Sequence, residues 1–186
     1  LSLQCRAEMI TDEFIEYSSK LNVRLEFGLQ TIHENEGVAV NRKDNMNKVR
    51  QNLTKIIDAG IEYEVSVIYG LPEQTLDSFR ETINWCLSMK TPVIKAFPLM
   101  LLRGTDTEKR KDTWGFVESG DSMPVAIQSD TFSFEDWLQM SKISQSLKGS
   151  ENMHPSSIEL LEKMLAKEKI QFHRFQPLVK GIETST

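Results

Sequence analysis

The chain has 186 residues, of which 39% are hydrophobic and 26% are charged, and its formal net charge is −5. This composition is that of a soluble globular domain with a buried core, and the absence of a basic stripe interleaved with aromatic residues argues against nucleic acid as a direct partner. The longest apolar stretches, such as residues 96–102, are too short to span a bilayer, and no signal peptide is visible. We therefore expect a cytoplasmic protein without a membrane segment.

Alternation of apolar and polar residues marks the strands in the first 100 residues. A repeat of two residues is the period of a β-strand, whose successive side chains point to opposite faces. The pattern predicts strands over residues 1–9, 22–30 and 62–69, and a fourth strand or extended run over residues 92–102.

Helical patterns separate these strands. Thr11, Asp44 and Thr75 each precede an apolar stripe of helical period, and all three are residue types that cap helix N-termini. Gly60 follows the stripe that Asp44 opens, at the place where a left-handed residue ends a helix. We expect the segment after the second strand to be a loop through Gly37.

The two faces of the predicted strands differ in polarity. Strand–helix repetition of this kind predicts right-handed crossovers and a parallel sheet. A parallel sheet covered on both faces has continuously apolar strands, but here one face carries Gln, Arg, Glu and Ser. An open barrel can turn such a row toward a polar ligand. The sequence therefore predicts an α/β fold that is half of a partial (β/α) TIM-like barrel with parallel strands.

A different pattern begins after Gly104. Ser133 and Ser156 each stand three residues before an acidic residue, which is the spacing of a capping box and predicts two further helices. The chain is expected to have a C-terminal helical extension and to divide into three parts: residues 1–116 as the barrel half, residues 117–150 as a post-barrel strand and helix, and residues 151–186 as a C-terminal helix and tail.

Four stretches lie where the predicted strands end. Ligand sites in parallel barrels form at the carboxyl ends of strands, in the loops that lead to the helices. The four stretches are residues 25–31, the pair Asn41-Arg42, residues 66–75 and residues 98–105.

The first two stretches resemble a motif of the radical S-adenosylmethionine (radical SAM) superfamily. In that family the fourth strand often ends in Glu-x-Gly-x-Gln-Ser, and an Arg follows about twelve residues later. This chain has Glu26, Gly28 and Gln30, with Thr31 at the Ser position, and Arg42 stands twelve residues after Gln30.

The other two stretches resemble the end of the same barrel. Residues 66–75 are similar to the fifth-strand Gly-x-Ile-x-Gly-x-x-Glu motif, with Ser66 in place of the first Gly, Ile68 and then Gly70. Residues 98–105 match a Pro-Leu…Gly-Thr string. The resemblance covers about residues 1–116 and is to members like oxygen-independent coproporphyrinogen oxidase and to cobalamin-dependent iron–sulfur oxidoreductases.

The resemblance implies a SAM site. Gln30 and Arg42 would contact the ribose hydroxyls and the methionine carboxylate, and a guanidinium suits a carboxylate because its fork donates two parallel hydrogen bonds. Ile68 would pack on the adenine, and Gly70 would let the backbone approach the ligand without a Cβ.

Two further residues are implied in the site. Ser66 stands near the place where some members have an Asp for the ribose, so its hydroxyl would substitute weakly. Glu26, together with Gln4, is expected to point into the same lumen and to touch SAM or a small-molecule substrate.

The family's Cys-x-x-x-Cys-x-x-Cys loop is absent, because Cys5 and Cys86 are the only cysteines. The chain also begins at Leu1 without an initiator Met, which suggests a segment of a longer protein whose N-terminal barrel half would be its partner. In that parent, the resemblance implies a [4Fe–4S] cluster that cleaves SAM to a 5′-deoxyadenosyl radical, and it leaves cobalamin open as a further cofactor. We expect no cofactor to bind this chain alone.

Other interpretations remain open. A different parallel-barrel enzyme, such as a lyase or aldolase, would need a lumenal Lys or His, for which Lys95 is the candidate. A non-enzymatic interaction domain would not need Gln30 or Arg42. We expect His33 in a solvated loop and His154 on the surface. The open sheet edge near residue 1 is expected to self-associate or to be covered by the C-terminal helices.

Overall fold

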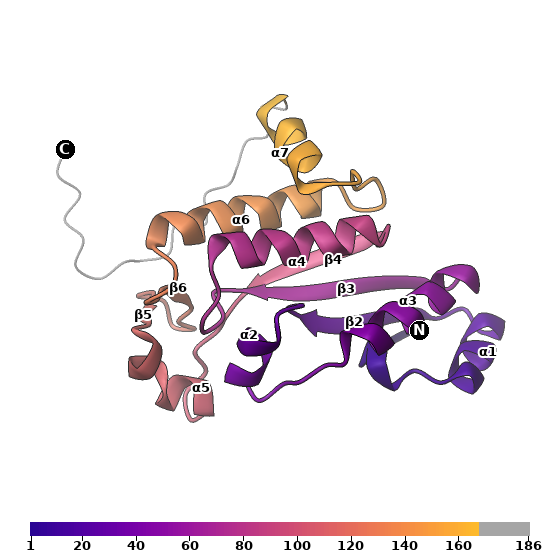
Figure 1. Ribbon diagram of the computed structural model, residues 1–186, viewed down its shortest axis with the longest axis horizontal. Coiled ribbons are helices and arrows are strands. Elements are labelled where there is room, and N and C mark those ends of the chain that lie inside the picture. Colours follow the sequence, from indigo (N-terminus) through magenta and orange to yellow (C-terminus); the bar gives the residue numbers. More distant parts are fainter. Residues whose placement is uncertain (168–186) are drawn as a thin grey trace.

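The computed structural model describes residues 1–167 and contains a sheet of four parallel strands (Figure 1). The strands neighbour one another in chain order, as in one arc of a barrel. They are β1 (Ser2–Cys5), β2 (Arg24–Gln30), β3 (Glu62–Tyr69) and β4 (Val93–Pro98). The predicted parallel α/β fold is confirmed.

Helices connect the strands and begin mostly where their capping residues predicted. The Thr11 side chain accepts a hydrogen bond from the Phe14 N–H, and Thr75 and Ser78 form a reciprocal capping box. The helices of this half are α1 (Asp12–Lys20), α2 (Glu34–Ala39), α3 (Met46–Asp58) and α4 (Leu76–Ser88).

The two faces of the sheet differ as the alternation predicted. The helix-facing side chains of the central strands, among them Leu25, Phe27 and Val67, are buried and belong to one apolar core with residues of α3, α4 and α6 (Phe134–Gly149). The opposite face carries Arg24, Glu26, Gly28, Gln30 and Ser66, which are all only partly buried. The structure thus has an outer apolar layer and an inner polar face, and the latter is called the lumenal face below.

The first strand is shorter than predicted. β1 ends at Cys5, and residues Ala7–Met9 form a 3-10 helix although polar and apolar residues continue to alternate. The Asn52 side chain on α3 donates hydrogen bonds to the carbonyls of Ala7 (2.8 Å) and Ile10 (3.2 Å), and these bonds hold the chain in a turn. A tertiary contact therefore overrides the local strand pattern.

One helix was not predicted, and two predicted helix caps were wrong. The segment expected as a loop through Gly37 contains α2. Asn45, not Asp44, caps α3, because the Asn45 side chain accepts from the Lys48 N–H at 3.2 Å. Ser157, not Ser156, bonds the first turn of α7 (Ile158–Lys167) through the Leu160 N–H at 3.4 Å.

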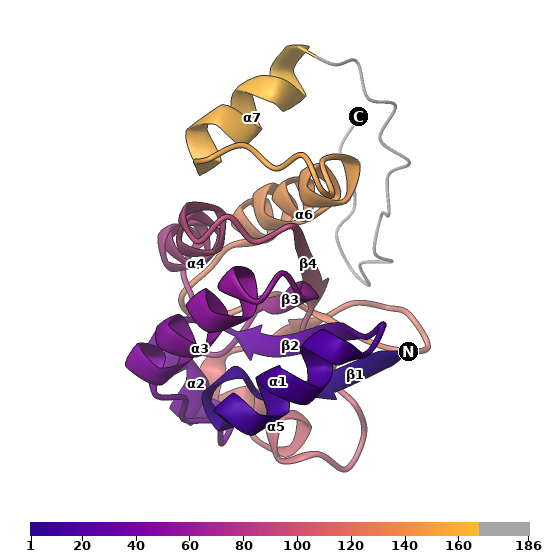
Figure 2. The same cartoon turned by 90° about the vertical axis from the view of Figure 1, so that its right-hand side faces the viewer.

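The segments after β4 extend the same core. Helix α5 (Asp106–Lys109) leads to an antiparallel pair of short strands, β5 (Val117–Glu118) and β6 (Ala126–Gln128). Helix α6 lies beside α4 and against β4, and α7 lies on α4 and α6, farthest from β1 (Figure 2). No helix among residues 1–167 is long and apolar enough to cross a membrane.

Helix α6 and the loop that follows it cover the β4 edge of the sheet. The Ser144 hydroxyl on α6 donates to the Ala96 carbonyl (2.7 Å), and the Asn152 N–H donates to the Pro92 carbonyl (2.8 Å). The Ile94 N–H donates to Nε2 of His154 at 3.0 Å. Of the two alternatives expected for the edge near residue 1, coverage by C-terminal helices is not seen among residues 1–167, and self-association stays a prediction. The expectation that His154 is a surface residue was wrong.

The contact of His154 predicts a pH-dependent stability. Burial lowers the pKa of His154 from its ordinary 6.5, although Glu151 opposes the shift. Because the folded pKa is the lower one, the stabilisation is complete above pH 6.5 and is lost as the pH falls through the folded pKa. We expect thermal melts to show this loss, and we expect His154→Gln, whose amide oxygen accepts at any pH, to reduce it. An identical pH slope in both proteins would contradict this role.

Candidate ligand-binding site

The carboxyl end of β2 has an irregular backbone that redirects Gln30. The pairing of β2 with β3 shifts register between Gly28 and Gln30, and Gln30 has a φ of 67°. A left-handed backbone costs a residue with a Cβ about 1–2 kcal/mol, and such strain tends to occur at functional sites. The Gln30 Oε1 atom is buried and has no hydrogen-bond partner among residues 1–167. It is an acceptor without a donor.

Arg42 reaches the same strand from the loop after α2. The Arg42 N–H donates to the Gly37 carbonyl at 2.8 Å, and a Cβ on Gly37 would lie 2.6 Å from the Arg42 carbonyl oxygen. The Arg42 Nη2 atom donates to the Gly28 carbonyl. A Cβ on Gly28 would lie 3.7 Å from Arg42 Nη1 and 3.9 Å from Ser66 Oγ. The bare backbone at Gly28 therefore separates the guanidinium from the Ser66 hydroxyl.

Asp44 orients the Arg42 guanidinium. The Asp44 carboxylate accepts from Arg42 Nε at 2.9 Å and from Arg6 Nη2 at 2.6 Å, and its side chain is only 8% exposed. Two of the Arg42 nitrogens thus have partners inside the protein, and Nη1 is the one nearest the lumenal face at Gly28. The sequence predicted Asp44 as a helix cap and did not predict its ion pair with Arg42.

A cleft of about 240 Å³ brings these groups together. Its lining includes Gln30, Arg42 and Asp44, together with His33 at the start of α2. The Gln30 amide and the Arg42 guanidinium suit a ligand that presents hydroxyl and carboxylate groups. The cleft lies at the carboxyl end of β2, and the carboxyl end of a parallel strand is the predicted place for a ligand.

The other predicted residues do not line this cleft. Ile68 is half-buried on the lumenal face, one pleat beyond Ser66. Glu26 accepts a hydrogen bond from the Ser2 hydroxyl on β1. Gly70 has a φ of 87°, and a Cβ there would lie 3.0 Å from the Ala126 carbonyl oxygen. Backbone conformation and packing on β6 therefore require glycine at position 70, independently of any ligand.

The lumenal face contains an ion-paired cluster toward the amino ends of β2, β3 and β4. Glu64 is buried, and Lys95 Nζ donates to both of its carboxylate oxygens at 2.8 and 2.9 Å, while Arg24 Nε lies 3.6 Å away. A Schiff-base lysine reacts as a free amine, whereas Lys95 is held by a carboxylate. This geometry gives no support to the lyase or aldolase interpretation.

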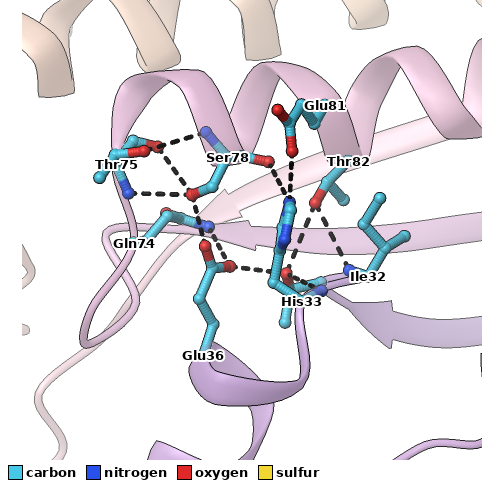
Figure 3. A network of polar contacts seen from close by, with 9 residues as sticks. Ile32, His33, Glu36, Gln74, Thr75, Ser78, Glu81 and Thr82 are labelled. Carbon is cyan, nitrogen blue, oxygen red and sulfur yellow. Dashed lines mark hydrogen bonds and ion pairs between the residues drawn. The ribbon is translucent and has the colours of Figure 1, made fainter.

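A buried polar network, missed in the sequence, joins the loops after β2 and β3 (Figure 3). Its centre is the Glu36 side chain on α2, which is 1% exposed. The Glu36 carboxyl accepts from Thr31 Oγ1 (2.6 Å), from Gln74 Nε2 (3.4 Å) and from Ser78 Oγ. No local pattern separates Glu36 from its exposed neighbour Glu34, because its partners are distant in sequence.

His33 is attached to α4 and does not lie in a solvated loop. Its Nε2 atom lies 3.1 Å from the Ser78 carbonyl oxygen and 3.2 Å from Glu81 Oε2. The imidazole therefore connects the start of α2 to α4, which corrects the expectation of a free loop histidine.

Comparisons with known proteins found a family model, a relative and solved structures to which this chain is similar. Residues 1–86 match the family model described as the radical SAM superfamily. The uncharacterized protein YtqA of Bacillus subtilis (strain 168) is 31% identical over 114 residues, which are 59% of this chain and 35% of YtqA. The chain thus spans about a third of the length of this relative.

Two solved structures share the fold at low identity. Coproporphyrinogen III oxidase (HemN) from Escherichia coli, described as a radical SAM enzyme, is 21% identical with a TM-score of 0.59, over 80% of this chain and 32% of HemN. The methyltransferase TsrM from Kitasatospora setae, solved with cobalamin and a [4Fe-4S] cluster, is 15% identical with a TM-score of 0.54, over 67% of this chain and 25% of TsrM. The parallel sheet matches the partial TIM-like barrel of these proteins.

Proposed function

This chain belongs to the radical SAM superfamily, and we propose that it supplies the SAM-binding and substrate-facing half of a radical SAM iron–sulfur oxidoreductase. One observation carries the proposal: Gln30 and Arg42, which are twelve residues apart, line one cleft at the carboxyl end of β2. The match to the family model ends at residue 86 and includes both residues.

The residues present fit SAM. The unpartnered Gln30 Oε1 can accept from a ribose hydroxyl, and Arg42 Nη1 lies where a carboxylate can approach over Gly28. Ser66 adds a hydroxyl across Gly28 from the guanidinium, and Ile68 offers an apolar surface on the same face for adenine. In this proposal the chain binds and orients SAM, and the Glu64–Lys95 pair forms part of the wall that faces the substrate.

The residues present do not fit an iron–sulfur cluster. Cys5 packs on the helix-facing core and contacts the Leu3 carbonyl, away from the lumenal face. Burial raises the pKa of Cys86 from 9.0 to about 12, so this thiol stays protonated at neutral pH, whereas cluster ligands are thiolates. Among residues 1–167 no group of three His, Cys, Asp or Glu side chains is placed to hold a metal ion.

We therefore assign the cluster, and the electron it supplies for SAM cleavage in this family, to a separate N-terminal barrel half. That half would pair with the edge of β1, which has no strand partner among residues 1–167, and without it this edge would mediate self-association. Cobalamin, which TsrM carries, is a further cofactor open to the assembled protein.

Titration calorimetry with SAM tests the proposal. We expect weak or no binding to this chain alone and saturable binding when the N-terminal half is added. If the assembled protein, reconstituted with iron and sulfide, neither binds SAM nor forms 5′-deoxyadenosine, the proposed function is wrong.

Gly28→Ala separates binding from folding. The added Cβ makes ordinary contacts at 3.7 and 3.9 Å, so the fold accepts it, and replacing a strand glycine removes a cost of roughly 0.5–1 kcal/mol. The methyl group occupies the space over which a ligand would reach Arg42. We expect an unchanged or higher melting temperature with SAM binding weakened about tenfold, which is about 1.4 kcal/mol. Wild-type affinity in this variant would place the ligand elsewhere.

A further inference from the structure

Glu36 is connected to each part of the proposed site through one intermediate residue, which is Thr31, Gln74 or Gly37. Its carboxyl accepts from Thr31 Oγ1, and Thr31 directly follows Gln30, whose backbone is left-handed. The same Thr31 hydroxyl accepts from the His33 N–H at 3.1 Å, which closes the turn into α2. The Glu36 contact therefore fixes the residue that follows Gln30.

On the other side, Glu36 reaches the loop after β3 through Gln74. The Gln74 side chain is fully buried, and its Nε2 atom donates to Glu36 (3.4 Å) and to the Ile68 carbonyl (3.1 Å). Its Oε1 atom accepts from the N–H groups of Gly70 (2.7 Å) and Leu71 (3.3 Å). Figure 3 shows Gln74, from the loop after β3, and Glu36, from α2, pointing toward each other.

Helix α2 extends the same connection to Arg42. Gly37 follows Glu36, and its carbonyl accepts from the Arg42 N–H at 2.8 Å. The Ser78 hydroxyl at the start of α4 donates to the other Glu36 oxygen and anchors α2 on that helix. The position of α2, and with it the start of the Arg42 segment, thus depends on a carboxyl group that does not face the cleft.

We propose that Glu36 is a positioning residue that sets the spacing between the Gln30–Arg42 side and the Ile68–Gly70 side of the SAM site. The inference rests on the proposed function. A ligand that contacts two different loops binds tightly only when the distance between the loops is fixed. A buried residue that holds the two loops by hydrogen bonds therefore affects affinity without contacting the ligand.

Hydrogen exchange on the full chain without ligand gives the first test. Glu36→Gln keeps the size of the side chain but replaces one acceptor oxygen by an NH₂ group, which cannot accept from both sides of the network. We expect Gly70 and Leu71 amides to exchange at least about tenfold faster, since Gln74 loses its anchor. Ile83→Val, in the buried face of α4, is the control for a general loss of stability.

SAM affinity of the assembled protein gives the second test. Glu36→Gln and Thr31→Val should weaken SAM binding about three- to tenfold, Thr31→Ser should restore it because the hydroxyl returns, and Ile83→Val should leave it unchanged. Unchanged exchange at Gly70 and Leu71, or wild-type affinity in both variants, would overturn the inference. Failure of the wild-type protein to bind SAM would instead overturn the proposed function, so the two failures are distinguishable.

Discussion

Arg42→Ala should weaken SAM binding to the assembled protein by roughly ten- to a hundredfold, because charge-assisted hydrogen bonds contribute about 1.5–3 kcal/mol each. Arg42→Lys should bind with intermediate affinity. An ammonium retains the charge, but it cannot contact Asp44 and the Gly28 carbonyl and also donate to a ligand carboxylate as the separate Nη1 of Arg42 does. Titration calorimetry with SAM measures both effects.

The matched control is Arg50→Ala. Arg50 is an exposed residue on α3 whose guanidinium lies 5.5 Å from the centre of the Trp85 ring, away from the cleft. Its replacement should leave SAM affinity unchanged. Thermal melts of each variant separate lost binding from the cost of leaving Asp44 with Arg6 as its remaining partner. Equal affinities for Arg42→Ala and wild type would favour the non-enzymatic interaction domain.

Trp137→Ala should destabilise the whole chain by about 3–5 kcal/mol, which is the usual cost of truncating a buried tryptophan. Trp137 on α6 is fully buried, and its ring centre lies 5.6 Å from that of Tyr69 on β3. Chemical denaturation followed by circular dichroism and by tryptophan fluorescence should give a single shifted transition. Two transitions, with the sheet unaffected, would mean that residues 117–150 fold as a separate unit.

Leu160→Ala is the control for this prediction. Leu160 lies on α7 and is 44% exposed, so its truncation should cost far less than that of Trp137. A similar loss of stability in both variants would contradict the central place of Trp137 in the core.

Alternating polarity predicted the sheet because each strand has one face against helices and one toward the lumen. The same rule overextended the first strand, because the bonds from Asn52 to the carbonyls of Ala7 and Ile10 come from a helix about forty residues later. Capping residues located most helices, but Asp44 and Asn45 are adjacent and both can cap. Only the contact with Arg42 shows that Asp44 has another partner.

The candidate site was predicted through Gln30 and Arg42 but not through the groups that hold them. The resemblance identified both residues, and the structure places them in one cleft. The left-handed backbone of Gln30 and the burial of Glu36 depend on pairing with β3 and α4, so no local sequence signal contained them. For Gly70 the resemblance gave a ligand as the reason for glycine, and the structure adds a second reason, because a Cβ there would lie 3.0 Å from the Ala126 carbonyl oxygen.

The most direct test of the lumenal-face site is an amide NMR titration of this chain, isotopically labelled and combined with its N-terminal half, with SAM. We expect saturable shifts at Gly28, Gln30, Arg42 and Ser66, and little change on the outer faces of α3 and α7. Saturable binding whose shifts avoid β2 and the Arg42 loop would contradict it.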